Sequence, residues 1–171
     1  MSAVLITGSA GAGKSAVAAA LARRGLASLD DDEDPFLARF VDSTGAVVAE
    51  EPAEPDAAWL SRHRWEWDPG RLDELIRAAA PQTLYLCGGA DNQLELADRF
   101  GRVFLLEIDE ATMLARLDAR QPGEWGHSGD SLEYIRRLRP GYQERLRMAG
   151  AILIDATRPL DQVVNAIIAP R

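Results

Sequence analysis

The stretch Gly8-Ser9-Ala10-Gly11-Ala12-Gly13-Lys14-Ser15 decides the fold, because it joins an apolar run at residues 3–7 to an alanine-rich run at residues 14–24. The first run predicts a buried strand and the second a helix. Glycines between a strand and a helix let the backbone curl with its N–H groups turned inward. Such amides, together with the positive end of the helix dipole, attract phosphate. The stretch therefore predicts a phosphate-binding loop.

Lys14 is the only lysine among the 19 basic residues of the chain, and all the others are arginine. Keeping a lysine here indicates that a compact point charge is needed. In a loop of this pattern, the lysine reaches the β- and γ-phosphates of ATP and the Ser15 hydroxyl ligates Mg²⁺. The alternative is a glycine-rich turn with a solvated lysine. The predicted phosphate contacts are Gly8, Ser9, Ala10, Gly11, Ala12, Gly13, Lys14, Ser15 and Ala16.

The composition is that of one globular domain over residues 1–171, with 47% hydrophobic and 27% charged residues. The apolar runs fall short of the roughly 20 residues that cross a bilayer, and we expect no secretory leader. Cys87 is the only cysteine and is expected to be a buried strand residue, which points to the cytoplasm. A net charge of −8 disfavours nucleic acid and anionic membranes as partners. We expect a monomer or homodimer.

Apolar runs alternate with helical patterns along the whole chain. Strands are expected at residues 3–7, 26–29, 83–87, 103–108 and 151–155. Helices are expected at residues 14–24, 36–41, 59–67, 71–79, 92–100, 109–121, 131–148 and 160–169, with a loop or small hairpin at 42–56. This alternation predicts an α/β fold, a three-layer α/β/α sandwich with a five-stranded parallel sheet and right-handed crossovers.

Two classes of phosphate-loop protein fit the chain poorly. The N-K-x-D sequence with which GTPases read guanine does not occur. Residues 105–110 resemble the hydrophobic Asp-Glu motif of AAA-type motors, but they lie about ninety residues after Lys14. The chain also lacks the length for the helical lid of that class, and Asp109 is already explained as the N-cap of the following helix.

Residues 108–120 resemble the helix that precedes the lid in the adenylate kinase and shikimate kinase group of P-loop NTPases. Arg116 and Arg120 are four residues apart and lie on one helix face. The resemblance implies that one stacks on adenine while the other meets phosphate. Residues 154–163, with Arg158 and Pro159, are similar to the last strand and adenine loop of the group. We call residues 121–130 the lid.

Three arginines, Arg136, Arg137 and Arg139, stand on the helix after the lid. In the group, such arginines close onto the phosphates, and Arg137 matches the family position best. The alternative for each is a solvated helix arginine or a surface ion pair.

Leu29-Asp30-Asp31-Asp32 matches the Asp-x-Asp pair that ends the second strand of shikimate kinase. That resemblance implies that Asp30 belongs to the Mg²⁺ site and that Asp32 binds the acceptor hydroxyl and helps to remove its proton. The register stays open by one residue, since Asp31 is also acidic. A solvated acidic turn is the alternative.

The third strand is followed by Gly88 and Gly89, where shikimate kinase has three glycines whose amides hold the substrate carboxylate. Gly88, Gly89 and Asn92 are the expected acceptor contacts here. The departure, with Asp91-Asn92-Gln93 added, indicates an acceptor other than shikimate or a role for Asp91 near Mg²⁺. Alternatively, Asp91 is the N-cap of a helix at residues 92–100.

Residues 33–80, which we call the flap, occupy the place of the acceptor-binding helices in the P-loop kinase plan. Their most distinctive part is residues 59–67, with three tryptophans, His63 and the arginines Arg62 and Arg64. These side chains form either an aromatic, cationic pocket for the acceptor or the packed core of the flap. Arg62 is the expected acceptor contact.

Together, these features predict a protein that transfers the γ-phosphoryl group of ATP to a small-molecule hydroxyl or phosphate acceptor. The expected ligands are ATP, Mg²⁺ and that acceptor, and the expected catalytic residues are Lys14, Asp32, Arg120 and Arg137. The alternatives are a nucleotide-binding regulatory protein without acceptor chemistry and a kinase acting on polynucleotide ends.

Overall fold

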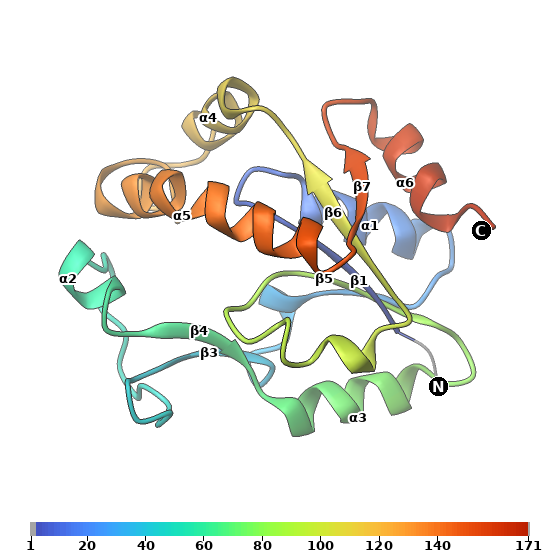
Figure 1. The fold of residues 1–171 in the computed structure, drawn as a ribbon, viewed down its shortest axis with the longest axis horizontal. Coiled ribbons are helices and arrows are strands. Elements are labelled where there is room, and N and C mark those ends of the chain that lie inside the picture. The colour runs from blue at the N-terminus through green and yellow to red at the C-terminus, as the bar shows by residue number, and fades with distance from the viewer. Residues whose placement is uncertain (1–2, 171) are drawn as a thin grey trace.

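The computed structural model describes residues 3–170, and its centre is a parallel sheet of five strands in the order β2-β5-β1-β6-β7 (Figure 1). The strands are β1 (Ala3–Gly8), β2 (Ser28–Asp30), β5 (Leu84–Cys87), β6 (Arg102–Glu107) and β7 (Ile152–Asp155). The predicted five-stranded parallel sheet is confirmed. Because all strands run the same way, their carboxyl ends share one edge of the sheet.

Successive residues of β1 point to opposite faces of the sheet, and each face carries its own core. Val4 and Ile6 pack in one buried cluster with the helices at residues 14–23 and 160–168, whereas Ala3 and Leu5 pack in another with the helix at residues 69–79. Burial on both faces explains why this strand is apolar throughout. The helices are α1 (Lys14–Arg23), α2 (Ala57–Leu60), α3 (Pro69–Ala79), α4 (Glu110–Asp118), α5 (Gly129–Met148) and α6 (Leu160–Ile168), with the short 3₁₀ helices η1 (Asp31–Glu33) and η2 (Ala97–Arg99).

Most of the flap differs from the prediction. The expected helices at residues 36–41 and 59–67 are wrong, since β3 (Ala38–Val41) and β4 (Arg64–Trp67) form a two-stranded antiparallel sheet and only the short α2 precedes β4. Trp65 and Trp67 are two residues apart, as strand geometry requires for side chains on one face, and both pack against the core that includes Leu72. An aromatic run of this length carries no decisive period.

The helix expected at residues 92–100 is also wrong, because this segment consists of turns followed by η2. The side chains of Asn92 and Gln93 are buried and hydrogen-bonded to other segments, which fixes the chain in a non-helical path. The remaining predicted elements are present, with ends shifted by a few residues. The Asp109 carboxylate accepts a hydrogen bond from the Thr112 amide at 2.7 Å, so the predicted N-cap of α4 is confirmed.

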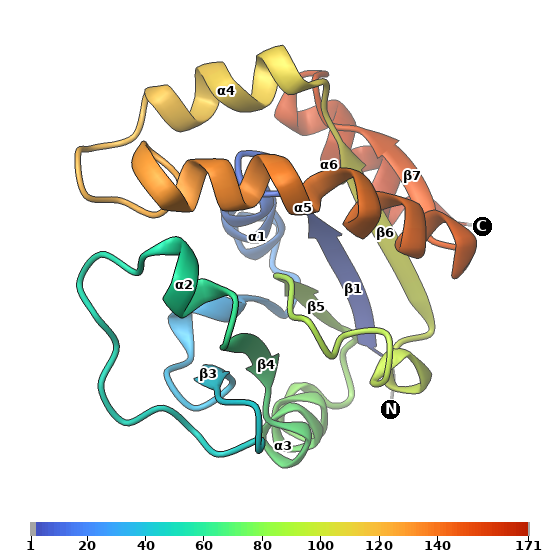
Figure 2. The ribbon, with the colours of Figure 1, turned by 60° about the vertical axis from the view of Figure 1, so that its left-hand side comes forward.

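The helices α4 and α5 lie on one side of the carboxyl edge of the sheet, and the flap strands β3 and β4 lie on the other (Figure 2). Among residues 3–170, every helix is too short or too polar to serve as a membrane span.

Two neighbouring leucines test the core. Leu105 and Leu153 face each other in register on β6 and β7, yet Leu105 is fully buried and Leu153 is 48% exposed. We expect Leu105→Ala to lower the free energy of unfolding by about 2–5 kcal/mol, through lost burial and a residual cavity. Leu153→Ala should cost less than about 1 kcal/mol. Urea denaturation measures both, and equal losses would contradict the packing described.

Candidate functional site

The phosphate-binding loop leaves β1 where there is no room for a side chain. A Cβ at Gly8 would lie 2.8 Å from the Leu106 carbonyl oxygen and 2.9 Å from the Ala12 side chain. Gly11 and Gly13 have φ values of +77° and +95°, a region that side chains disfavour. Glycine is therefore required at three points of the loop, as its sequence predicted.

Two sets of hydrogen-bonding groups at the loop, the amides at the N-terminus of α1 and the Ser9 hydroxyl, are suited to binding a phosphate. Within the described chain, no side chain caps the N-terminus of α1, whose N-cap is Gly13. The Ser9 hydroxyl is buried, and no hydrogen-bond partner is found for it among residues 3–170. Buried polar groups normally have partners, so both features are typical of a site that an anion completes.

The Lys14 ammonium folds back over the loop. It donates to the carbonyl oxygens of Gly8 at 3.0 Å and Ser9 at 3.4 Å. Burial lowers the pKa of Lys14, while the negative charges of the three neighbouring aspartates, Asp31, Asp32 and Asp30, oppose that shift. The cation thus stands between the loop and an acidic turn.

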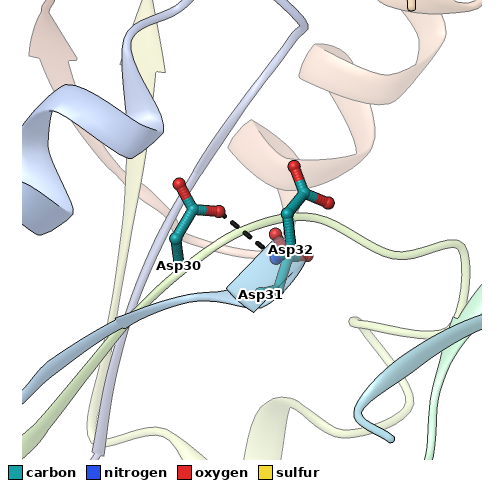
Figure 3. A group of neighbouring side chains, drawn as sticks. All are labelled: Asp30, Asp31 and Asp32. Atoms are coloured by element: carbon teal, nitrogen blue, oxygen red, sulfur yellow. Dashed lines mark hydrogen bonds between the residues drawn. The ribbon is translucent and has the colours of Figure 1, made fainter. Parts of the chain in front are cut away.

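That acidic turn, Asp30 to Asp32, follows β2 at the carboxyl edge of the sheet. Each residue offers a carboxylate oxygen, and the three atoms lie within 4.8 Å of one another (Figure 3). Asp30 and Asp32 extend to the same side of the turn, and the Asp30 carboxylate accepts from the Asp32 amide at 3.3 Å. Asp30 is buried and Asp32 is exposed.

Asp31 is buried and serves a different purpose. One of its oxygens, Oδ2, accepts from the Trp67 indole N–H and from the Gly89 amide, both at 3.0 Å. Burial raises the pKa of Asp31 to about 6, against the lowering effect of these two hydrogen bonds and of Lys14. Asp32 is exposed, but the chain around its carboxylate partly desolvates it and so raises its pKa. The repulsion of Asp30 adds to this shift, and Lys14 and Arg120 act in the opposite sense.

The segment after β5 closes the site from the other side, and its amides are bonded within the chain. The Gly88 amide donates to the Ile6 carbonyl at 3.0 Å, and the Ala90 amide donates to the Gln93 side-chain oxygen at 3.4 Å. The Gly89 amide donates to Asp31 as described. A Cβ at position 88 would overlap the Asp31 carboxylate, so Gly88 lets that carboxylate lie on the backbone.

Asp91 and Asn92 hold the free edge of β4. The Asp91 carboxylate accepts from the Trp65 amide at 2.9 Å, while the Asp91 amide donates to the Trp65 carbonyl at 2.7 Å. The Asn92 side chain bonds the Trp67 amide at 3.0 Å and the Trp67 carbonyl at 2.9 Å. The alternative role of Asp91 as an N-cap is therefore wrong, because no helix begins at residue 92. Asn92, expected to contact the acceptor, uses its oxygen and nitrogen to position the flap.

A buried polar network lies behind the glycine pair. Thr7, the last residue but one of β1, donates to the Gln93 side-chain oxygen at 3.1 Å and is hydrogen-bonded to the Tyr142 hydroxyl of α5. A Cβ at Gly89 would lie 2.9 Å from that hydroxyl. Sequence reasoning missed this network and the bond between Trp67 and Asp31, because nothing local to any of these residues signals their partners.

Arg116 bridges the two segments for which the sequence predicted contacts with ATP. Its guanidinium donates to the carbonyl oxygens of Gly11 at 3.1 Å and Ala156 at 2.9 Å. Arg120 donates to the Trp125 carbonyl in the lid, and its charge acts on both Lys14 and Asp32. Arg158 is exposed and pairs with Asp155 at 3.2 Å.

The arginines after the lid point to different partners. The Arg137 guanidinium lies 5.8 Å from the ring centroid of Tyr134, and Arg136 pairs with Glu110 at 3.1 Å. Arg139 donates to the Ile108 carbonyl. Of the three, Arg137 is exposed and has no ion pair within the described chain, which leaves its charge available.

The flap aromatics pack on one another. Phe40 lies edge-on to Trp59 and Trp65, with ring centroids 4.7 and 4.8 Å apart, and His63 stacks on Trp59 at 4.1 Å. Trp67 is fully buried. These contacts favour the packed-core alternative for the tryptophans. Arg62 is exposed next to this cluster and forms no ion pair within residues 3–170.

The flap also reaches the other wall of the site. The Ala57 amide, at the start of α2, donates to the Asp130 carboxylate in the first turn of α5 at 2.8 Å. Asp130 is also the last residue of the lid, so flap and lid meet at this point (Figure 2).

Comparison with known proteins points to kinases. No protein-family model matches the chain. It is 36% identical over 67 residues to a thymidylate kinase of Coprothermobacter proteolyticus, a match that covers 39% of this chain and 34% of that protein. The chain therefore spans about a third of the length of the curated relative that it matches.

Solved structures match over nearly the whole chain. A shikimate kinase of Acinetobacter baumannii in complex with shikimate has a TM-score of 0.60 at 17% identity, covering 98% of this chain and 93% of that one. A deoxyadenosine kinase of M. mycoides with bound dATP gives 0.56 at 16% identity, covering 97% of both chains. A sugar kinase of Janibacter sp. gives 0.57 at 16% identity, covering 98% and 92%. The predicted P-loop small-molecule kinase fold is confirmed.

The raised pKa of Asp31 predicts a pH-dependent gain of stability in Asp31→Asn. A carboxyl whose pKa rises from 3.8 to about 6 on folding makes the unfolding free energy fall between these pH values as pH rises. The full loss of unfolding free energy, at most about 3 kcal/mol, is reached above pH 6. The asparagine oxygen can accept both hydrogen bonds without a charge.

We therefore expect Asp31→Asn to be more stable than the parent protein at pH 8 and equal to it near pH 4. Urea denaturation across this range measures the difference. A variant that is less stable at pH 8 would show that the carboxylate charge contributes favourably in the folded state.

Proposed function

We propose that this protein is an ATP-dependent kinase that phosphorylates a hydroxyl group of a small molecule. The observation that carries the proposal is the meeting of three groups at one edge of the sheet: the phosphate-binding loop, the Lys14 ammonium and the exposed Asp32 carboxylate. Phosphoryl transfer needs a cation on the phosphates and a carboxylate at the acceptor, held at a fixed separation.

The nucleotide would lie between the loop and the segment after β7. The loop amides, the Ser9 hydroxyl and the N-terminus of α1 are suited to the phosphates. Lys14 would exchange its loop carbonyls for phosphate oxygens, and Arg120 would add positive charge from the lid side. Arg116 holds the loop against Ala156, which supports an adenine position near Arg158 and Pro159.

The acidic turn has the donor chemistry for Mg²⁺. Hard divalent cations prefer carboxylate and hydroxyl oxygens, and the turn supplies carboxylate oxygens within 4.8 Å of one another. Asp30 and Ser15 would hold the ion, whereas Asp31 is engaged with Trp67 and Gly89. When bound, Mg²⁺ would neutralise charge on the β- and γ-phosphates.

Asp32 would orient the acceptor. Its raised pKa, caused mainly by burial and by Asp30, suits a group that takes a proton. The acceptor oxygen bonds to the γ-phosphorus as the bond from phosphorus to the bridging oxygen of ADP breaks, and the hydroxyl proton passes to Asp32. Arg137 has an available charge on the far wall and would close onto the transferred group.

Replacing the ammonium group tests the nucleotide half. Lys14→Met should weaken the binding of MgATP, measured by calorimetry, by at least about tenfold, since it removes the cation expected on the phosphates. Arg23→Met, which removes an exposed charge from the last turn of the same helix, is the matched control. Unchanged affinity in Lys14→Met would refute the proposed nucleotide site.

Replacing the acceptor carboxylate tests the chemistry. In a screen with ATP and Mg²⁺ against nucleosides, nucleotides, shikimate, gluconate and aminoglycosides, ADP release should identify an acceptor. Asp32→Asn should then lose about 10²–10⁴-fold in turnover while its ATP affinity stays within about threefold. Glu33→Gln, an exposed neighbour in the same turn, should retain activity. ADP release with no acceptor, or indifference to Asp32→Asn, would favour a regulatory nucleotide-binding protein.

A further inference from the structure

The amides after β5 follow the carboxyl end of a central strand, at the edge of the sheet where the proposed function places the acceptor, and they already have partners. The three consecutive N–H groups of Gly88, Gly89 and Ala90 donate to the Ile6 carbonyl, the Asp31 carboxylate and the Gln93 side chain. Only the Gly89 amide is bonded to a charged group. A pair of glycines at the end of a strand otherwise exposes such amides to an anion.

Asp31 is built into this place rather than lying against it by chance. Asp31 is 4% exposed, and its carboxylate lies against the Gly88 backbone. A Cβ atom at position 88 would overlap that carboxylate. The same oxygen that accepts from Gly89 accepts from the Trp67 indole. The Trp67 backbone is hydrogen-bonded to the Asn92 side chain, which keeps the Trp67 indole N–H in place beside Asp31.

We propose that Asp31 is a specificity-determining residue that occupies the anion position of the acceptor site, so that the enzyme selects acceptors without a carboxylate or phosphate there. The inference rests on the proposed kinase function. A tethered carboxylate keeps the Gly89 amide and the Trp67 indole permanently occupied. An anionic acceptor would have to displace it and would also meet the charge of Asp32. Specificity of this kind works by repelling the wrong ligand.

The acceptor class that follows is a neutral or cationic hydroxyl compound, such as a nucleoside, a polyol or an amino sugar. Nucleoside monophosphates and sugar acids are disfavoured. This choice narrows the acceptors of the proposed function from small hydroxyl compounds in general to those without a carboxylate or phosphate group.

Paired acceptors that differ only by one anionic group test the proposal. Thymidine is compared with dTMP, sorbitol with gluconate, and methyl shikimate with shikimate, each with ATP and Mg²⁺ and with ADP release as the readout. The parent protein should prefer the neutral member of the pair that it uses by at least about tenfold in kcat/KM. Asp31→Ala, which frees the Gly89 amide and the Trp67 indole and leaves Asp32 unchanged, should reduce that preference at least tenfold.

Glu33→Gln removes one negative charge from the same turn without touching Gly89, and it should leave the preference unchanged. A parent protein that favours the anionic member, or an Asp31→Ala variant with the parent's preference, would overturn the inference while leaving the kinase function intact.

A binding measurement decides the same question without turnover. In ¹⁵N-labelled Asp31→Ala, formate should fill the place of the lost carboxylate and shift the Gly89 amide and Trp67 indole signals in a saturable way. The parent protein and Glu33→Gln should show no such shift. An equal response in the parent, or none in Asp31→Ala, would overturn the assignment of an anion position. Should no acceptor yield ADP, the proposed function fails and the formate result still decides the occupancy of this position.

Discussion

The amide of Gly89 and the indole N–H of Trp67 converge on one oxygen of Asp31, and the part of the molecule proposed to bind the acceptor depends on that contact. It joins the end of β2, the end of β5 and the flap strand β4, which are separated in the chain. A buried donor without a partner costs about 1–3 kcal/mol. Removing the Asp31 carboxylate would leave both donors unpaired and would loosen these three segments together. The Asp31 side chain therefore holds these three segments together and also places a negative charge among them.

Positive charge organises the glycine loop and the segment after β7, which the proposed function assigns to the nucleotide. Lys14 lies on loop carbonyls, and Arg116 holds the loop to the segment after β7. The acidic turn faces these cations, which is why Lys14 and Arg120 lower the pKa of Asp32 while burial raises it. These opposite charges offset one another at the carboxyl edge of the sheet, and in the proposed function a polyphosphate with its metal would keep a similar balance.

A helix or strand could be predicted from the sequence when the residues that stabilise it are close to it in the chain. The strand, glycine loop and helix at the start of the chain carry their own signals, and their positions were predicted almost to the residue. The strands β3 and β4 were mistaken for helices, because the edge of β4 is completed by the side chains of Asp91 and Asn92 some 25 residues away. The turns after Asn92 were missed for the same reason. Long-range hydrogen bonds leave no periodic trace in a sequence.

The sequence by itself determined the parallel sheet, the loop with its lysine and the acidic turn at the end of the second strand. These follow from local propensity and from glycine where no side chain fits. It did not determine which of the three consecutive aspartates does what. Only the tertiary structure assigned Asp31 to the glycine pair and left Asp32 facing outward, because Gly88 alone leaves room for a carboxylate and Trp67 supplies the second donor.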